Sequence, residues 1–261
     1  MLRQLGLIFL GLFVFTFQLH AETPEQKGLR IAKIMEEQNE GFIGDSSDML
    51  MVLIDAHGSR VERKMEGKVM EMDDDGDRSL LDFQSPLDVR GTKMLTWSHK
   101  DGNDDQWLYL PSVRRVKRIS SSGQSSSFLG SEFSFEDLGS QEIEKFKYKF
   151  LKDDKIDEHD VWVLERTAKE SSGYSKQVMF VRRDIKAPIK IEYYDRREEL
   201  LKIAEFKDFE KFKVNDKTFH RASKIHMKNQ QTRKESIFEW SERKLGVKHS
   251  KNDFEQRSLR Q

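Results

Sequence analysis

The sequence predicts a mainly β protein (α+β), in which a single incomplete antiparallel β-barrel of about 11 strands is covered by an N-terminal helix and a helical or irregular lid. Three observations predict this fold class. Short segments with alternating apolar residues follow one another along most of the chain, turn residues separate nearly all of them, and no long helical pattern lies between them. Short connections of this kind favour antiparallel pairing of neighbouring strands.

The N-terminus has the pattern of a secretory signal peptide. Arg3 precedes an apolar run from Leu5 to Phe17, and the small residue Ala21 ends the polar segment that follows. We therefore expect residues 1–21 to be removed and residues 22–261 to form one exported domain. The alternative is an uncleaved anchor helix, although a run of about 13 residues is too short to span a bilayer core of roughly 30 Å.

A helix is predicted directly after the cleavage site. Thr23 is its N-cap, Pro24 suits the first helical position, and Gln26 completes a capping box. Apolar residues at helical spacing give the segment one apolar side as far as about Gln38: Leu29, Ile31, Ile34 and Met35.

Strands make up most of the rest of the chain. In the first, Asp48–Ala56, both faces carry apolar side chains, with Leu50, Val52 and Ile54 on one face and Met49, Met51 and Leu53 on the other. The second covers Val61–Val69. Further strands are predicted at Leu80–Phe83, Lys93–His99, Gln106–Leu110, Glu142–Phe150, Val161–Thr167, Gln177–Arg182, Pro188–Tyr194, Leu201–Phe209, Phe219–Lys228 and Glu235–Trp240.

One irregular segment, Ser120–Leu138, interrupts the series of strands. We expect it to cover the concave face of the sheet together with the N-terminal helix and to leave an apolar pocket inside. Its serine-rich part, Ser120–Ser127, is typical of a mobile lid, and Phe128 with Leu129 would close the mouth of the pocket.

Composition excludes several classes of protein. The 46 basic residues balance the 46 acidic ones, so the chain lacks the excess of positive charge that is usual in proteins that bind nucleic acid. A chain without cysteine has no disulfide, thiolate metal site or cysteine nucleophile. We recognise no histidine pair at metal-binding spacing and no serine nucleophile motif. Asp101, Asn103 and Asp105 begin like a calcium loop, but the loop has no Gly at its sixth position and no closing Glu at its twelfth, so a solvated hairpin turn is favoured. We therefore predict no metal, no cofactor and no enzymatic activity.

Two groups of residues are candidates for binding. Arg114, Arg115, Lys117 and Arg118 form either a patch for anionic headgroups or an acidic partner, or a solvated strand paired with acidic neighbours. Apolar residues of the first strand and of the central third of the chain form either the lining of an acyl-chain cavity or ordinary core. These cavity candidates are Leu50, Val52, Ile54, Leu95, Trp97, Trp107, Tyr109, Phe128, Leu129, Phe133 and Phe135.

Several segments of the sequence are distinctive enough to indicate a protein family. They are Ser85–Thr92, Asp104–Pro111, Arg115–Ile119, Phe128–Leu138 and the terminal Phe254-x-x-Arg257-x-Leu259. On these segments the whole mature chain resembles the outer membrane lipoprotein-sorting protein family, which is similar in fold to the periplasmic lipoprotein carrier LolA and its receptor LolB. The resemblance implies a LolA-like incomplete barrel with a helical lid and an apolar cavity for acyl chains.

The resemblance also implies a cellular location and a function. It implies a soluble periplasmic carrier that binds a lipid or a lipoprotein acyl chain and passes it across the periplasm, with an RND-type inner-membrane exporter as partner and a part in outer membrane biogenesis. Two alternatives stay open, namely an accessory adaptor of such an exporter whose cavity is only structural, and an envelope hydrolase.

Overall fold

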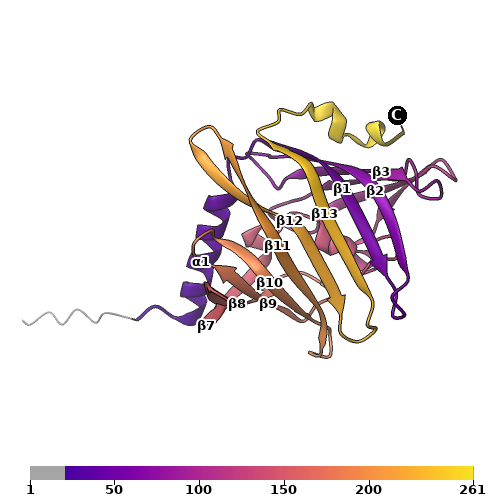
Figure 1. Ribbon diagram of the computed structural model, residues 1–261. Coiled ribbons are helices and arrows are strands. Elements are labelled where there is room, and N and C mark those ends of the chain that lie inside the picture. The colour runs from indigo at the N-terminus through magenta and orange to yellow at the C-terminus, as the bar shows by residue number, and fades with distance from the viewer. Residues whose placement is uncertain (1–20, 261) are drawn as a thin grey trace, which may run out of the picture.

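The computed structural model describes residues 21–260 and shows an open antiparallel sheet of 13 strands, preceded by one α-helix (Figure 1). The predicted fold class is therefore confirmed, with more strands than the expected 11 or so. The predicted signal peptide, except for Ala21, lies outside the described residues. The helix is α1 (Pro24–Asn39), and the strands are β1 (Gly44–Ile54), β2 (Arg60–Met70), β3 (Arg78–Ser85), β4 (Lys93–Trp97), β5 (Asp105–Leu110), β6 (Arg115–Ile119), β7 (Phe146–Ile156), β8 (His159–Ala168), β9 (Lys176–Arg182), β10 (Ala187–Tyr194), β11 (Leu200–Val214), β12 (Lys217–Asn229) and β13 (Glu235–Leu245).

The two edges of the sheet are consecutive strands of the chain. The spatial order is β6-β5-β4-β3-β2-β1-β13-β12-β11-β10-β9-β8-β7, so the first strand pairs with the last in the middle of the sheet. Residues 120–145, which we call the covering segment, connect the edge strand β6 to the opposite edge strand β7. The segment contains three short 3-10 helices, η1 (Ser121–Gly123), η2 (Phe135–Leu138) and η3 (Ile143–Lys145).

The main hydrophobic core lies between the concave face of the sheet and the covering segment. Inward side chains from nearly every strand contribute to it, and Phe128, Phe133 and Phe135 of the covering segment are buried among them. The expected cover over the concave face is thus present. The main core consists of Ile31, Met49, Met51, Met65, Phe83, Met94, Leu108, Ile119, Phe128, Phe133, Phe135, Leu164, Tyr174, Met179, Val181, Ile191, Tyr193, Ala204, Met227 and Phe238.

Helix α1 packs against the edge strand β7. Its start has the predicted capping box, in which the Thr23 hydroxyl accepts from the Gln26 backbone N–H and the Gln26 side chain accepts from the Thr23 N–H. Gly28 lies so close to β7 that a Cβ atom there would approach the Lys149 and Phe150 backbone nitrogens to 2.8 Å. The last turn reaches the β11–β12 hairpin, where the Gln38 side chain donates to the Thr218 carbonyl at 2.9 Å.

The convex face of β2–β6 is covered as well, which the sequence did not lead us to expect. Two C-terminal 3-10 helices, η4 (Lys251–Phe254) and η5 (Gln256–Arg260), lie on it (Figure 1). Phe254 and Leu259 are completely buried in a cluster with Leu95 and Trp107. The indole Nε1 of Trp97 donates to the Phe254 carbonyl at 2.7 Å, which fixes the end of the chain on the sheet.

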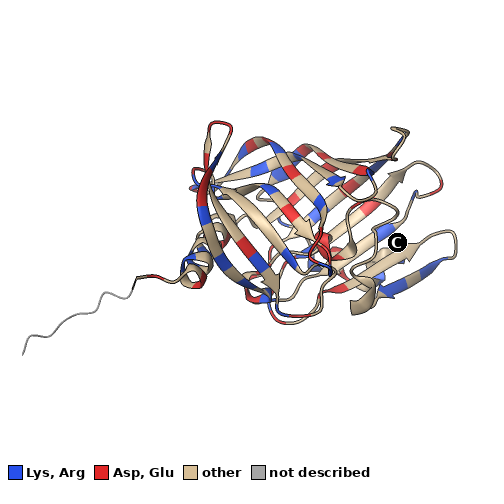
Figure 2. Ribbon diagram, turned by 90° about the horizontal axis from the view of Figure 1, so that it is seen from below, with Lys and Arg blue, Asp and Glu red and all other residues tan. Residues whose placement is uncertain are grey.

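Charged residues of both signs are spread over the strands rather than gathered in one block (Figure 2), in keeping with the equal numbers of basic and acidic residues. Within residues 21–260, no helix is long and apolar enough to cross a membrane.

Candidate functional site

The covering segment is anchored in the core by its aromatic side chains. Phe128 is completely buried, with its ring centroid 6.0 Å from that of Phe83 and 5.6 Å from that of Phe135. Phe133 stacks on Phe238 of β13 with centroids 4.4 Å apart. The Phe128 N–H donates to the Phe133 carbonyl at 2.7 Å, which closes a tight turn between them. Phe128 is therefore inside the protein, where it fills the centre of the concave face.

The cavity candidates from the sequence fall into three separate places. Phe128, Phe133 and Phe135 belong to the main core, and Leu129 packs against it. Leu95, Trp97, Trp107 and Tyr109 belong to the convex cluster under the C-terminal helices. Leu50, Val52 and Ile54 alternate with Met49, Met51 and Leu53, which face the core, and so lie on the convex face of β1. The structure brings together the residues of the covering segment and does not bring the other candidates to them; contact with lipid stays a prediction.

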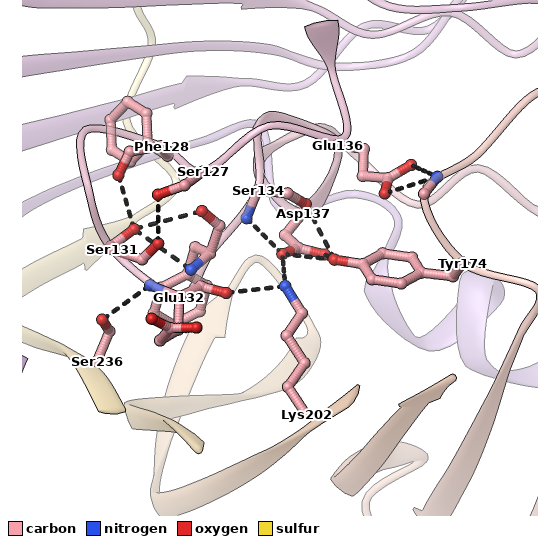
Figure 3. A network of polar contacts seen from close by, with 12 residues as sticks. Ser127, Phe128, Ser131, Glu132, Ser134, Glu136, Asp137, Tyr174, Lys202 and Ser236 are labelled. Carbon is pink, nitrogen blue, oxygen red and sulfur yellow. Dashed lines mark hydrogen bonds and ion pairs between the residues drawn. The ribbon is translucent and has the colours of Figure 1, made fainter. Parts of the chain in front are cut away.

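A buried ion pair holds the covering segment to β11 (Figure 3). The Lys202 ammonium lies 2.7 Å from the Asp137 carboxylate and also donates to the Glu132 carbonyl at 2.8 Å. The two side chains are only 4% and 6% exposed. A buried charge requires a partner and further hydrogen bonds, and this pair has both.

Tyr174 and Ser134 complete the surroundings of Asp137. The Tyr174 hydroxyl donates to Asp137 Oδ1 at 2.9 Å, and the Ser134 backbone N–H donates to Oδ2 at 2.7 Å. Burial raises the pKa of Tyr174 well above its usual value, and the negative charge of Asp137 acts in the same direction. The phenol therefore keeps its proton and remains a donor.

A polar cavity of about 460 Å³ lies beside this network. The covering segment forms one wall, and the residues that begin or end β9 to β13 form the rest. The lining residues are Ser125, Ser127, Gly130, Ser131, Glu132, Phe133, Ser134, Gly173, Tyr174, Arg196, Leu201, Lys202, Asn229 and Lys234. A second cavity, of about 170 Å³, lies between the β4–β5 turn, the covering segment and the β8–β9 loop, and polar residues predominate in its lining too.

The predicted basic patch lies on the edge strand β6 and the turn before it. Arg115, Lys117 and Arg118 are exposed on β6, and Arg114 is exposed in the turn. Arg118 forms an ion pair with Asp105 of the neighbouring strand. The patch therefore combines features of both interpretations, since one member is paired with an acidic neighbour and the edge itself is open to solvent.

Three carboxylates near the end of the covering segment are close enough to share a cation. Glu36, Glu142 and Glu144 each place one oxygen within 4.8 Å of the others. Burial and the nearby charge of Glu144 raise the pKa of Glu36. Acidic groups of this kind are common on protein surfaces without an ion, and nothing further at these residues indicates one.

Sequence reasoning did not identify Lys202, Tyr174 or Asp137 as site residues. Asp137 lies within the segment Phe128–Leu138 that carries part of the family resemblance, and this was the only available signal. Lys202 is one of 46 basic residues, and the sequence alone gives no reason to distinguish it from the lysines that are exposed.

Comparison with known proteins places this arrangement in a family. A family model described as "Uncharacterized protein" matches residues 75–261. No curated protein matches the chain in sequence. A DUF1329 family protein from Desulfovibrio piger is 27% identical, with a TM-score of 0.85 over 91% of this chain and 99% of that one. A LolA superfamily protein from Nitrosomonas europaea is 19% identical, with a TM-score of 0.69 over 88% of this chain and 98% of that one, and shares the fold.

A third solved structure is more similar in sequence. It is an outer membrane lipoprotein-sorting protein domain from Vibrio parahaemolyticus, 41% identical, with a TM-score of 0.87 over 91% of this chain and 100% of that one. At this identity over the full length of the Vibrio domain, the chain belongs to the outer membrane lipoprotein-sorting protein family and has its LolA-like fold.

Proposed function

We propose that the protein is a periplasmic carrier that binds an acyl chain of a lipid or lipoprotein and passes it across the periplasm together with an RND-type exporter. The name of the Vibrio relative supports the sorting role. The observation that carries the proposal is a set of half-buried apolar side chains at the margin of the main core. They are Met35, Phe150, Trp162, Phe206, Ile225 and Trp240, which come from α1 and from strands on both sides of β10.

These side chains are half-buried and pack against the main core. Phe206 and Ile225 are direct cross-strand partners on β11 and β12, so they form one apolar surface. Burying an acyl chain on such a surface gains about 0.8 kcal/mol for each methylene. Because Phe128 and its neighbours already fill the centre, we place the acyl chain along this margin, and deeper entry requires the covering segment to move.

Mass spectrometry of organic extracts tests the proposal. The protein is purified without detergent, and bound phospholipid or acylated peptide is expected in the extract. The variant Ile225→Ser should lose most of this material, whereas Ile54→Ser, a matched change on the convex face of the sheet, should retain it. Repeated absence of any lipid would contradict the carrier function and favour the alternative, an accessory adaptor of an RND-type exporter with a structural core only.

A further inference from the structure

We infer that the 460 Å³ polar cavity beside the covering segment is a binding site for a phosphodiester group. The cavity is formed by four parts of the chain that are distant in sequence, namely the covering segment, the β8–β9 loop, the β10–β11 turn with the start of β11, and the end of β12 with the turn that follows. Its size is within the range of about 300–1,000 Å³ that is typical of small-ligand sites. Most of its lining consists of hydroxyl, amide and charged side chains.

The charge around the cavity suits a monoanion. Three cationic side chains line it, Arg196, Lys202 and Lys234, against the single carboxylate of Glu132. Asp137, which is paired with Lys202, lies directly behind the wall. The lining residues and Asp137 together therefore carry one net positive charge, and a phosphodiester carries one negative charge at neutral pH.

Hydrogen-bond donors remain free for such a ligand. Arg196 donates through Nε and Nη2 to the Ser172 carbonyl, at 3.3 and 3.2 Å, which orients the guanidinium and leaves Nη1 for another acceptor. Lys234 is exposed, and within residues 21–260 it has no carboxylate at ion-pair distance. Lys202 has two oxygen acceptors for its three N–H groups, so one N–H has no oxygen acceptor within residues 21–260.

The acid in the cavity is already engaged. Glu132 Oε2 accepts from the Asn229 amide at 2.6 Å, and the Glu132 backbone N–H donates to the Ser236 hydroxyl at 2.9 Å. These contacts hold the carboxylate against the β12–β13 side of the cavity. The guanidinium and the two ammonium groups are therefore the groups available to an incoming anion.

Part of the cavity lining belongs to the main core or packs against it. Phe133 and Tyr174 belong to the main core, and Leu201 packs against it. An anionic headgroup in the cavity would thus have apolar surface next to it for its glycerol and acyl portions. This extension to a lipid rests on the proposed carrier function; the phosphodiester site itself does not, because a soluble phosphodiester offers the same group.

Binding of three probes distinguishes these sources. The probes are phosphatidylglycerol, its deacylated form glycerophosphoglycerol, and diacylglycerol, which has the acyl chains without the phosphate. Binding is measured by native mass spectrometry and calorimetry for the full mature chain and for the variant Arg196→Gln/Lys234→Gln. The matched control is Arg197→Gln/Arg233→Gln, which removes two exposed arginines from the same two turns without changing a lining residue.

We expect the lining variant to weaken phosphatidylglycerol and glycerophosphoglycerol at least tenfold and to leave diacylglycerol unchanged, while the control variant binds all three like the parent. If the lining variant and the control variant lose the same affinity, the effect comes from general surface charge, and the proposed site is wrong. If diacylglycerol and phosphatidylglycerol bind equally and neither variant matters, the site is wrong and the carrier function stands. If only glycerophosphoglycerol binds, and only the lining variant loses it, the site stands and the carrier function falls. Absence of binding by all three probes overturns the site as well.

Discussion

The ion pair between Lys202 and Asp137 should be the most costly single polar contact to break. Lys202→Met removes the cation and leaves the Asp137 carboxylate buried, so we expect the free energy of unfolding to fall by about 3–5 kcal/mol. Urea denaturation measures the change. Lys207→Met is the control, since Lys207 pairs with Glu205 at 2.8 Å but is 47% exposed, and an exposed pair contributes at most about 1 kcal/mol. Similar losses in the two variants would show that burial of the first pair has no special weight.

Asp77 makes the stability of the protein depend on pH. Burial raises the pKa of Asp77 to about 7, although the Met72 backbone N–H donates to its carboxylate. The folded protein therefore binds this proton more tightly than the unfolded chain, whose aspartates titrate near pH 3.9. The stabilisation from this group is complete below about pH 4 and is lost as the pH rises through 7.

Asp77→Asn should remove that dependence, because the amide oxygen still accepts from Met72 and no proton is needed. We expect the variant to be more stable than the parent at pH 8 and to differ less at pH 4.5, by urea denaturation at both values. Asp74→Asn, an exposed position in the same turn, serves as the control. Parallel stability profiles for Asp77→Asn and the parent would contradict the assignment.

At the scale of single elements, the edge strand β6 offers a test of the basic patch. Arg115 and Lys117 are exposed on one strand that has a neighbour on one side only. If the patch binds anionic headgroups, Arg115→Gln/Lys117→Gln should weaken binding to phosphatidylglycerol vesicles by about 1 kcal/mol for each charge. Sedimentation with anionic and neutral vesicles measures this, and Lys152→Gln/Lys155→Gln on the opposite edge strand is the control. Unchanged binding would leave β6 with the role of a charged edge that discourages pairing with other chains.

The elements themselves were largely predictable from local patterns. The capping box and one-sided apolar spacing predicted α1, and alternation predicted every strand except β6, whose five residues include three cations. Which face of β1 meets the core was not predictable, because Met49, Met51 and Leu53 and their neighbours Leu50, Val52 and Ile54 are equally apolar. Packing against residues far away in the chain decides that Met49, Met51 and Leu53 face the core.

At the scale of the whole molecule, the C-terminal helices are expected to contribute much of the stability of the convex side. Phe254 is completely buried there, so Phe254→Ala should lower the free energy of unfolding by about 3–5 kcal/mol. It should also admit water to the Trp97–Trp107 pair, whose ring centroids are 5.0 Å apart, and shift tryptophan emission to longer wavelength. Leu87→Ala, at a side chain that is 85% exposed, should change neither property. An unaltered emission spectrum in Phe254→Ala would mean that the C-terminus does not shield the indoles.

The covering of both faces was only half predictable. The irregular segment with its three phenylalanines indicated cover for the concave face, and the structure confirms its position there. The terminal Phe254 and Leu259 lack a periodic pattern, and their burial depends on a contact with strands more than a hundred residues earlier in the chain. The candidate binding residues were not predictable for the same reason. Lys202 is recognised as a site residue only through its contact with Asp137, which Tyr174 also contacts in the folded protein.

The pairing of β1 with β13 has a consequence for how the protein is made. Met49 and Trp240 are partners across that seam, about 190 residues apart in the chain. Synthesis that delivers the N-terminus first leaves β1 without its second neighbour until β13 has emerged. The sheet is therefore completed only after β13 is available, and a product that terminates before β13 exposes the unpaired edge of β1.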